Sequence, residues 1–279
     1  MKLRWLLFLI PLVVSAQTTV FTWGGSGLVT SQQLLRDGAG TSFSPDTGRA
    51  FSTAAMTPDA SVYFGATLYG GYRQASGNDH FASAGIWDSA EGANPIAGTD
   101  TLEVRYNNSS DRNTSFYFLA MHELAAPVTV DASSQFAVTG RAVWGATVSV
   151  RTVIEAGGQY FVSGSLNSLA WSGNGTNTTS ATTLTFSNLQ NYTWLQYDPT
   201  SSFLAPPASG TGSPDFSAVT DVGFLFNRGM GAAGAEFGVA ISGMSVTATA
   251  IPEPSTYAAL AGLAALGLAV RRRRAAKNA

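Results

Sequence analysis

The 279-residue chain contains no cysteine, which excludes disulfide bonds, thiolate nucleophiles and cysteine-ligated metals. Charged residues are also scarce, at 11% of the chain, against about 25% in an average globular protein. The hydrophobic fraction of 45% is nevertheless enough to bury a core, so the low charge does not indicate disorder. The composition therefore predicts a folded chain that holds together without disulfide bonds.

Lysine is absent from residues 17–251, which hold eight arginines against eleven aspartates and five glutamates, a formal charge of −8. The other seven basic residues lie at the two ends of the chain. An acidic middle has no basic stripe to displace phosphate counterions, so nucleic acid is excluded as a partner. Basic residues clustered at the termini are typical of membrane targeting.

The amino end has the layout of a secretory signal peptide. Lys2 and Arg4 precede an apolar run at residues 6–14, and small residues lead up to Ala16. This pattern predicts a signal peptide helix over residues 1–16, which the secretion translocon accepts and signal peptidase cuts between Ala16 and Gln17. The apolar run is too short for a permanent span, which needs about 20 residues.

The carboxyl end combines three features in order. Pro252, Glu253 and Pro254 are followed by an uncharged stretch at residues 257–270 and then by four arginines, Arg271, Arg272, Arg273 and Arg274. As a helix, the uncharged stretch would measure roughly 21 Å, short of the ~30 Å hydrocarbon core of a bilayer. The arginines would hold that end in the cytoplasm. These residues predict a short membrane helix that can be held and then released.

The ordered triplet of Pro-Glu-Pro, apolar helix and arginine cluster resembles a PEP-CTERM sorting signal, covering residues 252–279. The resemblance implies recognition and cleavage by an exosortase-like membrane protease, with transient anchoring in the cytoplasmic membrane. It also implies delivery to the cell surface or extracellular matrix of a Gram-negative bacterium that makes exopolysaccharide, as in a biofilm. It implies nothing about residues 17–251.

The middle of the chain shows no helical periodicity. Short alternating or β-branched runs recur between clusters of glycine, serine, asparagine and proline, which is the pattern of short strands and turns. The clearest runs are 101–106, 116–121, 143–154, 160–162, 182–186, 193–197, 221–226, 237–241 and 245–249. About ten such strands predict an all-β fold, a single jelly-roll-like β-sandwich over residues 17–251.

Two apparent cofactor motifs lack the context that their chemistry needs. Residues 229–234 match the dinucleotide fingerprint letter for letter, but strand alternation follows where a helix is required, so a hairpin loop is predicted. His122 and Glu123 open like a zinc-protease helix, yet Ala126 stands where the second histidine would be,. We therefore expect no cofactor and no metal.

The sequence leaves two functions open for the middle. Glu103, Glu123, Glu155 and Glu236 supply carboxylates for a secreted glycan-active enzyme, a hydrolase or lyase, but their spacing places none of them together,. Glu103 lies on the polar side of its strand, where a solvated charge is expected. Trp171, flanked by serine and glycine, is the tryptophan best placed to stack on a sugar ring. We expect a noncatalytic surface or matrix protein that can bind polysaccharide, with the enzyme as the alternative.

Overall fold

The computed structural model describes residues 17–26, 33–34, 52–56, 66–73, 80–87, 96, 98–108, 115–143, 147–170, 181–199, 206–207, 210–228, 235–251 and 254–277. Most of the secondary structure in these ranges is antiparallel strand. The strands are β1 (Gln17–Gly24), β2 (Gln33–Leu34), β3 (Ser52–Met56), β4 (Ala66–Arg73), β5 (His80–Trp87), β6 (Thr101–Asn108), β7 (Ser115–Thr129), β8 (Gln135–Val143), β9 (Val148–Ala156), β10 (Gln159–Ser163), β11 (Asn167–Leu169), β12 (Thr182–Ser187), β13 (Trp194–Tyr197), β14 (Val219–Arg228) and β15 (Ala235–Ala250). The described helices are a 3₁₀ turn, η1 (Leu189–Asn191), and α2 (Pro254–Lys277).

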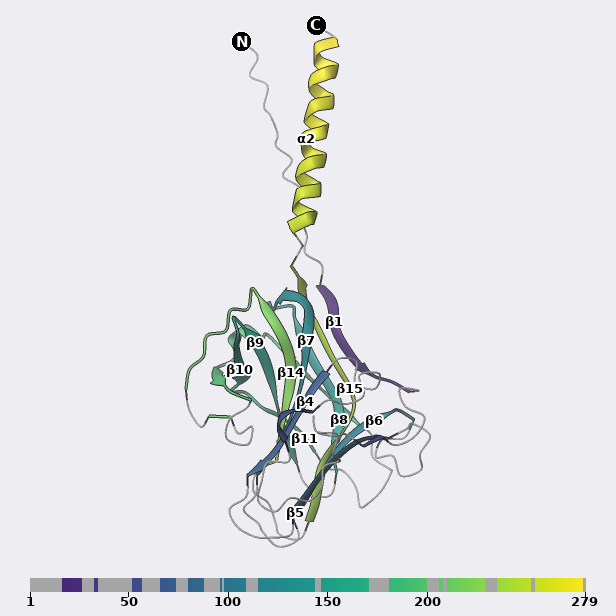
Figure 1. Ribbon diagram of the computed structural model, residues 1–279, viewed down its shortest axis with the longest axis vertical. Helices are drawn as coiled ribbons and strands as arrows, with labels where there is room; N and C mark the ends of the chain where they lie inside the picture. Colours follow the sequence, from purple (N-terminus) through teal and green to yellow (C-terminus); the bar gives the residue numbers. More distant parts are fainter. Residues whose placement is uncertain are drawn as a thin grey trace.

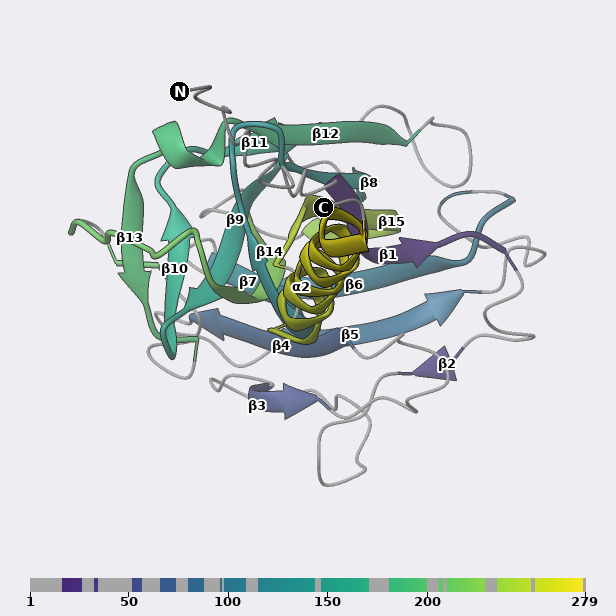
Figure 2. The ribbon, with the colours of Figure 1, turned by 90° about the horizontal axis from the view of Figure 1, so that it is seen from above.

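The strands form two packed layers that are joined at one corner (Figures 1 and 2). One layer runs β3-β4-β7-β14-β9-β10-β13, and the other is built around β15, which pairs with β6, β8 and β1. At the corner, Thr249 and Ala250 of β15 pair with Thr129 and Val128 of β7, so hydrogen bonding continues from layer to layer. The predicted all-β sandwich is confirmed, while its jelly-roll connectivity stays a prediction.

The core lies between the two layers because each strand alternates its side chains. On β14, Val222, Phe224 and Phe226 point inward and are fully buried. The centroid of the Phe224 ring lies 6.3 Å from the ring centroid of Phe136 on β8 and 6.1 Å from that of Phe186 on β12. Burying each such side chain contributes roughly 1.5–3 kcal/mol, so this aromatic group holds the layers together.

Two strand predictions are wrong. The runs 237–241 and 245–249 are one strand, β15, of sixteen residues. Its register with β8 shifts between Ile241 and Gly243. The bulge at Ser242 therefore changes whether the odd-numbered or the even-numbered side chains point inward,. The sequence pattern breaks there although the strand continues. The run 143–154, in contrast, is divided between the end of β8 and the start of β9.

The predicted hairpin around residues 229–234 is also wrong, although those residues lie outside the described ones. The flanking strands β14 and β15 do not pair with each other, because β14 lies between β7 and β9. The connection passes from one layer to the other. A strand rather than a helix follows, as predicted.

The C-terminal helix is longer than predicted. It begins at Pro254 and includes Arg271–Arg274 before it ends at Lys277, instead of covering only 257–270. Proline is compatible with a first helical turn, since no N–H is needed there, and arginine, alanine and lysine are good helix formers. Among the described helices, none combines the length and the apolar character needed to cross a membrane. The membrane role of this helix stays a prediction.

Candidate functional site: a carboxylate row beside a bend in β7

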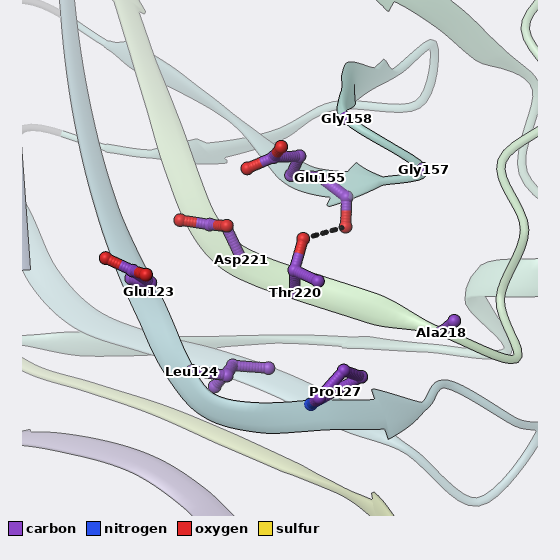
Figure 3. Close-up of a pocket in the computed structure, with 9 residues that line it drawn as sticks. All are labelled: Glu123, Leu124, Pro127, Glu155, Gly157, Gly158, Ala218, Thr220 and Asp221. Carbon is purple, nitrogen blue, oxygen red and sulfur yellow. Dashed lines mark hydrogen bonds between the residues drawn. The ribbon is translucent and has the colours of Figure 1, made fainter.

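Three acidic side chains from neighbouring strands lie side by side on one sheet face. Asp221 of β14 is directly opposite Glu123 of β7 on one side and Glu155 of β9 on the other. Directly opposite residues point to the same face of a sheet, and Figure 3 shows the three carboxylates grouped together. We call Glu123, Asp221 and Glu155 the carboxylate row. Tyr160 of β10 is paired with Glu155 and extends the row by one strand.

A bend in β7 opens the sheet beside the row. Glu123 pairs with Asp221 and Val128 pairs with Val219, so residues 124–127 of β7 face only Thr220. Pro127 falls in this bulge, where its missing N–H breaks no ladder bond,. The bend leaves a hollow of about 430 Å³ whose lining includes the row, Leu124 and Pro127 (Figure 3).

The opposite wall of the hollow is a tight turn. Gly157 and Gly158 join β9 to β10 with φ angles of 62° and 75°, a left-handed backbone that glycine adopts without strain. Thr220, which is the extra residue of β14 against β9, donates its hydroxyl to the Glu155 carbonyl oxygen at 3.4 Å. These contacts hold the end of β9 against β14 and fix Glu155 next to Asp221.

The crowding of carboxylates alters the acidity of Asp221. Its pKa is raised to about 7, mainly by burial, then by a hydrogen bond with the Glu155 side chain and by the negative charges of Glu155 and Glu123. Asp221 therefore holds a proton at a higher pH than an ordinary aspartate does,. In the part of the chain that the structure describes, no group of three His, Cys, Asp or Glu side chains is arranged to hold a metal ion.

The carboxylates named from sequence fall in different places. Glu123 and Glu155 come together, and Asp221, which sequence reasoning missed, joins them. Glu103 was expected to be solvated, but it is only 3% exposed. It faces Arg141 across the β15 residue Ala240, with which both are paired, and its negative charge favours the protonated guanidinium against the lowering of the Arg141 pKa by burial.

Of the other residues named from sequence, the structure describes some and not others. His122 of β7 stacks on Phe21 with ring centroids 4.4 Å apart. Trp171, Ala16, Pro252 and Glu253 lie outside the described residues.

A second feature lies where β1 begins and β15 ends, at the pole of the sandwich from which α2 extends (Figure 1). Gln17, the first residue of β1, pairs with Thr249 of β15 and donates its side-chain amide to the Ser133 carbonyl oxygen. Asp131 accepts hydrogen bonds from the Thr249 hydroxyl at 2.6 Å and from the Ser133 amide at 2.8 Å. We call Gln17, Asp131, Ser133 and Thr249 the clasp.

Asp131, the acidic residue of the clasp, keeps its negative charge over a wide pH range. Hydrogen bonds from the side chains of Ser133 and Thr249 lower the pKa of Asp131 to about 2 against the opposing effect of burial. Asp131 is therefore ionised at neutral and mildly acidic pH, and hydrogen bonds to an ionised acceptor are stronger than neutral ones. The start of the predicted mature chain and the last strand before the tail are thus held together.

Comparison with solved structures found distant similarities. The family 11 carbohydrate-binding module from Clostridium thermocellum, in complex with a β-1,3-1,4-mixed-linked tetrasaccharide, has a TM-score of 0.35 and 13% identity over 81% of this chain and 99% of the module. An agarase, AgWH50C, has a TM-score of 0.29 and 11% identity over 55% of this chain and 21% of its own.

Comparison by sequence identifies the tail. No curated protein matches the chain. Residues 250–274 match the PEP-CTERM protein-sorting motif, which confirms the resemblance of the C-terminal segment.

Proposed function

We propose that this chain is an exported, noncatalytic surface or matrix protein that is sorted through its tail and binds a neutral polysaccharide at the carboxylate row. The sorting part rests on the motif at residues 250–274 and on the signal peptide pattern before Gln17. Translocon, signal peptidase and an exosortase-like membrane protease are the partners in this route. The cytoplasmic membrane holds the tail transiently, and the cell surface or extracellular matrix of a Gram-negative bacterium is the destination.

The single observation that carries the binding proposal is the row of polar groups that crosses four strands beside the hollow. Tyr160, Glu155, Asp221 and Glu123 occupy one continuous line. Carboxylates accept strong hydrogen bonds from hydroxyl groups, and a tyrosine ring offers an apolar face for a sugar. A row several residues long suits a linear polymer better than a small compound.

Charge selects the kind of polymer. The three carboxylates lie close together, and residues 17–251 carry a formal charge of −8. A polysaccharide with carboxylate or sulfate groups would be repelled by this surface. The proposed ligand is therefore a neutral glycan that donates hydroxyl hydrogen bonds.

A secreted glycan-active enzyme is the second candidate, favoured by the raised pKa of Asp221, because perturbed acids are common in active sites. The arrangement of the carboxylates disfavours the enzyme. Glycosidase carboxylates flank the scissile bond about 5–9.5 Å apart, whereas Asp221 stands between Glu123 and Glu155 in one row along a single sheet face.

The binding proposal is tested with the purified full chain in detergent on an array of neutral and acidic glycans. We expect retention of neutral glycans, and we expect Glu123→Gln to weaken it about tenfold, since a charge-assisted hydrogen bond becomes a neutral one. Asp215→Asn is the matched control, because Asp215 is an exposed acid outside the hollow.

Three outcomes would contradict the proposal. Binding of acidic glycans alone would refute the charge argument, and equal binding by Glu123→Gln would remove the row from the site. Release of shorter glycans by the unaltered chain, abolished in Asp221→Asn, would establish the enzyme instead.

A further inference from the structure

The folded sandwich ends close to the sorting tail. β15 ends at Ala250 and α2 begins at Pro254, so three residues connect them. Three residues reach at most about 11 Å when fully extended. Any enzyme that cuts near Pro252–Pro254 therefore works directly against the pole of the sandwich.

The residues before this connection are held on both sides. Thr249 pairs with Gln17 of β1 and with Thr129 of β7, and Ala250 pairs with Val128. The Thr249 side chain is held as well, by its hydrogen bond to Asp131. Because a protease binds several consecutive residues of its substrate in an extended cleft, residues locked in a sheet are not available to it.

We infer that the clasp is a brake on removal of the sorting tail: the protease gains its full substrate only when the last residues of β15 detach from β1, β7 and Asp131. This inference rests on the proposed sorting function. The rate of tail removal then depends on how often Thr249 and Ala250 open, which is a local equilibrium rather than global unfolding. Asp131 stays ionised in neutral and mildly acidic surroundings, so the brake does not release with modest acidification.

Two kinds of variant test the brake in cells that contain the exosortase-like partner. The first inserts eight Gly/Ser residues between Ile251 and Pro252, which moves the tail away from the pole and leaves the clasp intact. The second is Thr249→Val. It removes the hydroxyl that donates a hydrogen bond to Asp131 and keeps a β-branched residue in the strand. Thr247→Val is the matched control, because the Thr247 hydroxyl donates to the Gln135 carbonyl at 3.4 Å and not to the clasp.

Tail removal is followed by pulse-chase labelling and intact mass of the full-length protein. We expect Thr249→Val to speed removal about tenfold, the effect of losing one hydrogen bond to a charged group. We expect the insertion to speed removal as well, because the protease then no longer needs the residues held in β15, and Thr247→Val to leave the rate unchanged. An unchanged or slower rate in the insertion variant overturns the brake while sorting stands. If the unaltered protein keeps Lys277 in strains with and without the partner, the sorting proposal fails and the brake fails with it.

Discussion

Asp221 gives the sharpest test of the site, because its charge is disfavoured by the fold. The proposed change is Asp221→Asn, which keeps the size of the side chain and removes its negative charge. An acid whose pKa is higher in the folded state than in the unfolded chain binds its proton more tightly when folded. The free energy of unfolding therefore falls as the pH rises from about 4 to about 7, and the whole penalty is present above pH 7.

The magnitude follows from the pKa. A rise from 3.8 to about 7 would cost about 4 kcal/mol in full. Asp221 is only partly buried, and water screens its interactions with Glu155 and Glu123, so we reduce the expected penalty to about 1–2 kcal/mol. Asp221→Asn should thus stabilise the protein by about 1–2 kcal/mol at pH 8 and by little at pH 4.5.

Urea denaturation at pH 4.5, 6 and 8 measures this difference. Asp215→Asn serves as the control with the opposite sign, because hydrogen bonds from Ser217 lower the pKa of the exposed Asp215. A variant Asp221→Asn that is less stable than the unaltered protein at pH 8, or that keeps the same pH dependence, would refute the account of the carboxylate row.

Two further outcomes follow from the sequence and the core. Phe224→Ala should lower the free energy of unfolding by about 3–5 kcal/mol, since it removes a fully buried ring that contacts Phe136 and Phe186,; thermal or urea melts check this, and a loss below about 1 kcal/mol would show that the two layers do not depend on these rings. The exported protein should begin at Gln17 in amino-terminal sequencing, and an intact Met1 in the surface fraction would contradict the signal peptide.

The fold class was predictable because alternation survives in the strands that bury one face. The runs 182–186 and 221–226 lie within β12 and β14. Prediction failed where the chain departs from regular strand geometry. The bulge at Ser242 changes the inward parity of β15, and a sequence with Gly243 at that point looks like a turn between two strands. Local pattern cannot distinguish a bulge from a strand end.

The carboxylate row could not be assembled from sequence for a related reason. Glu123, Glu155 and Asp221 lie far apart in the chain, and their meeting depends on the registers of β7, β9 and β14. Register is set by long-range packing, so no spacing rule connects the three acids. Glu103 shows the same limit, because its burial depends on Arg141, a residue two strands away. The tail was readable because its information lies in consecutive residues.

The two candidate sites are neighbours in the sheet, and the ladder shows why one can change without loss of the other. Val128 pairs with Ala250 at the end of β15 and with Val219 at the start of β14. Opening the clasp breaks the pairs of Thr249 and Ala250, but β14 keeps its pairing with β7 from Asp221 to Arg228 and with β9 from Asp221 to Asn227. The carboxylate row belongs to these longer ladders. Detachment of the last two residues of β15 therefore leaves the row in place, so the proposed removal of the tail does not conflict with the proposed binding of a polysaccharide by the sandwich.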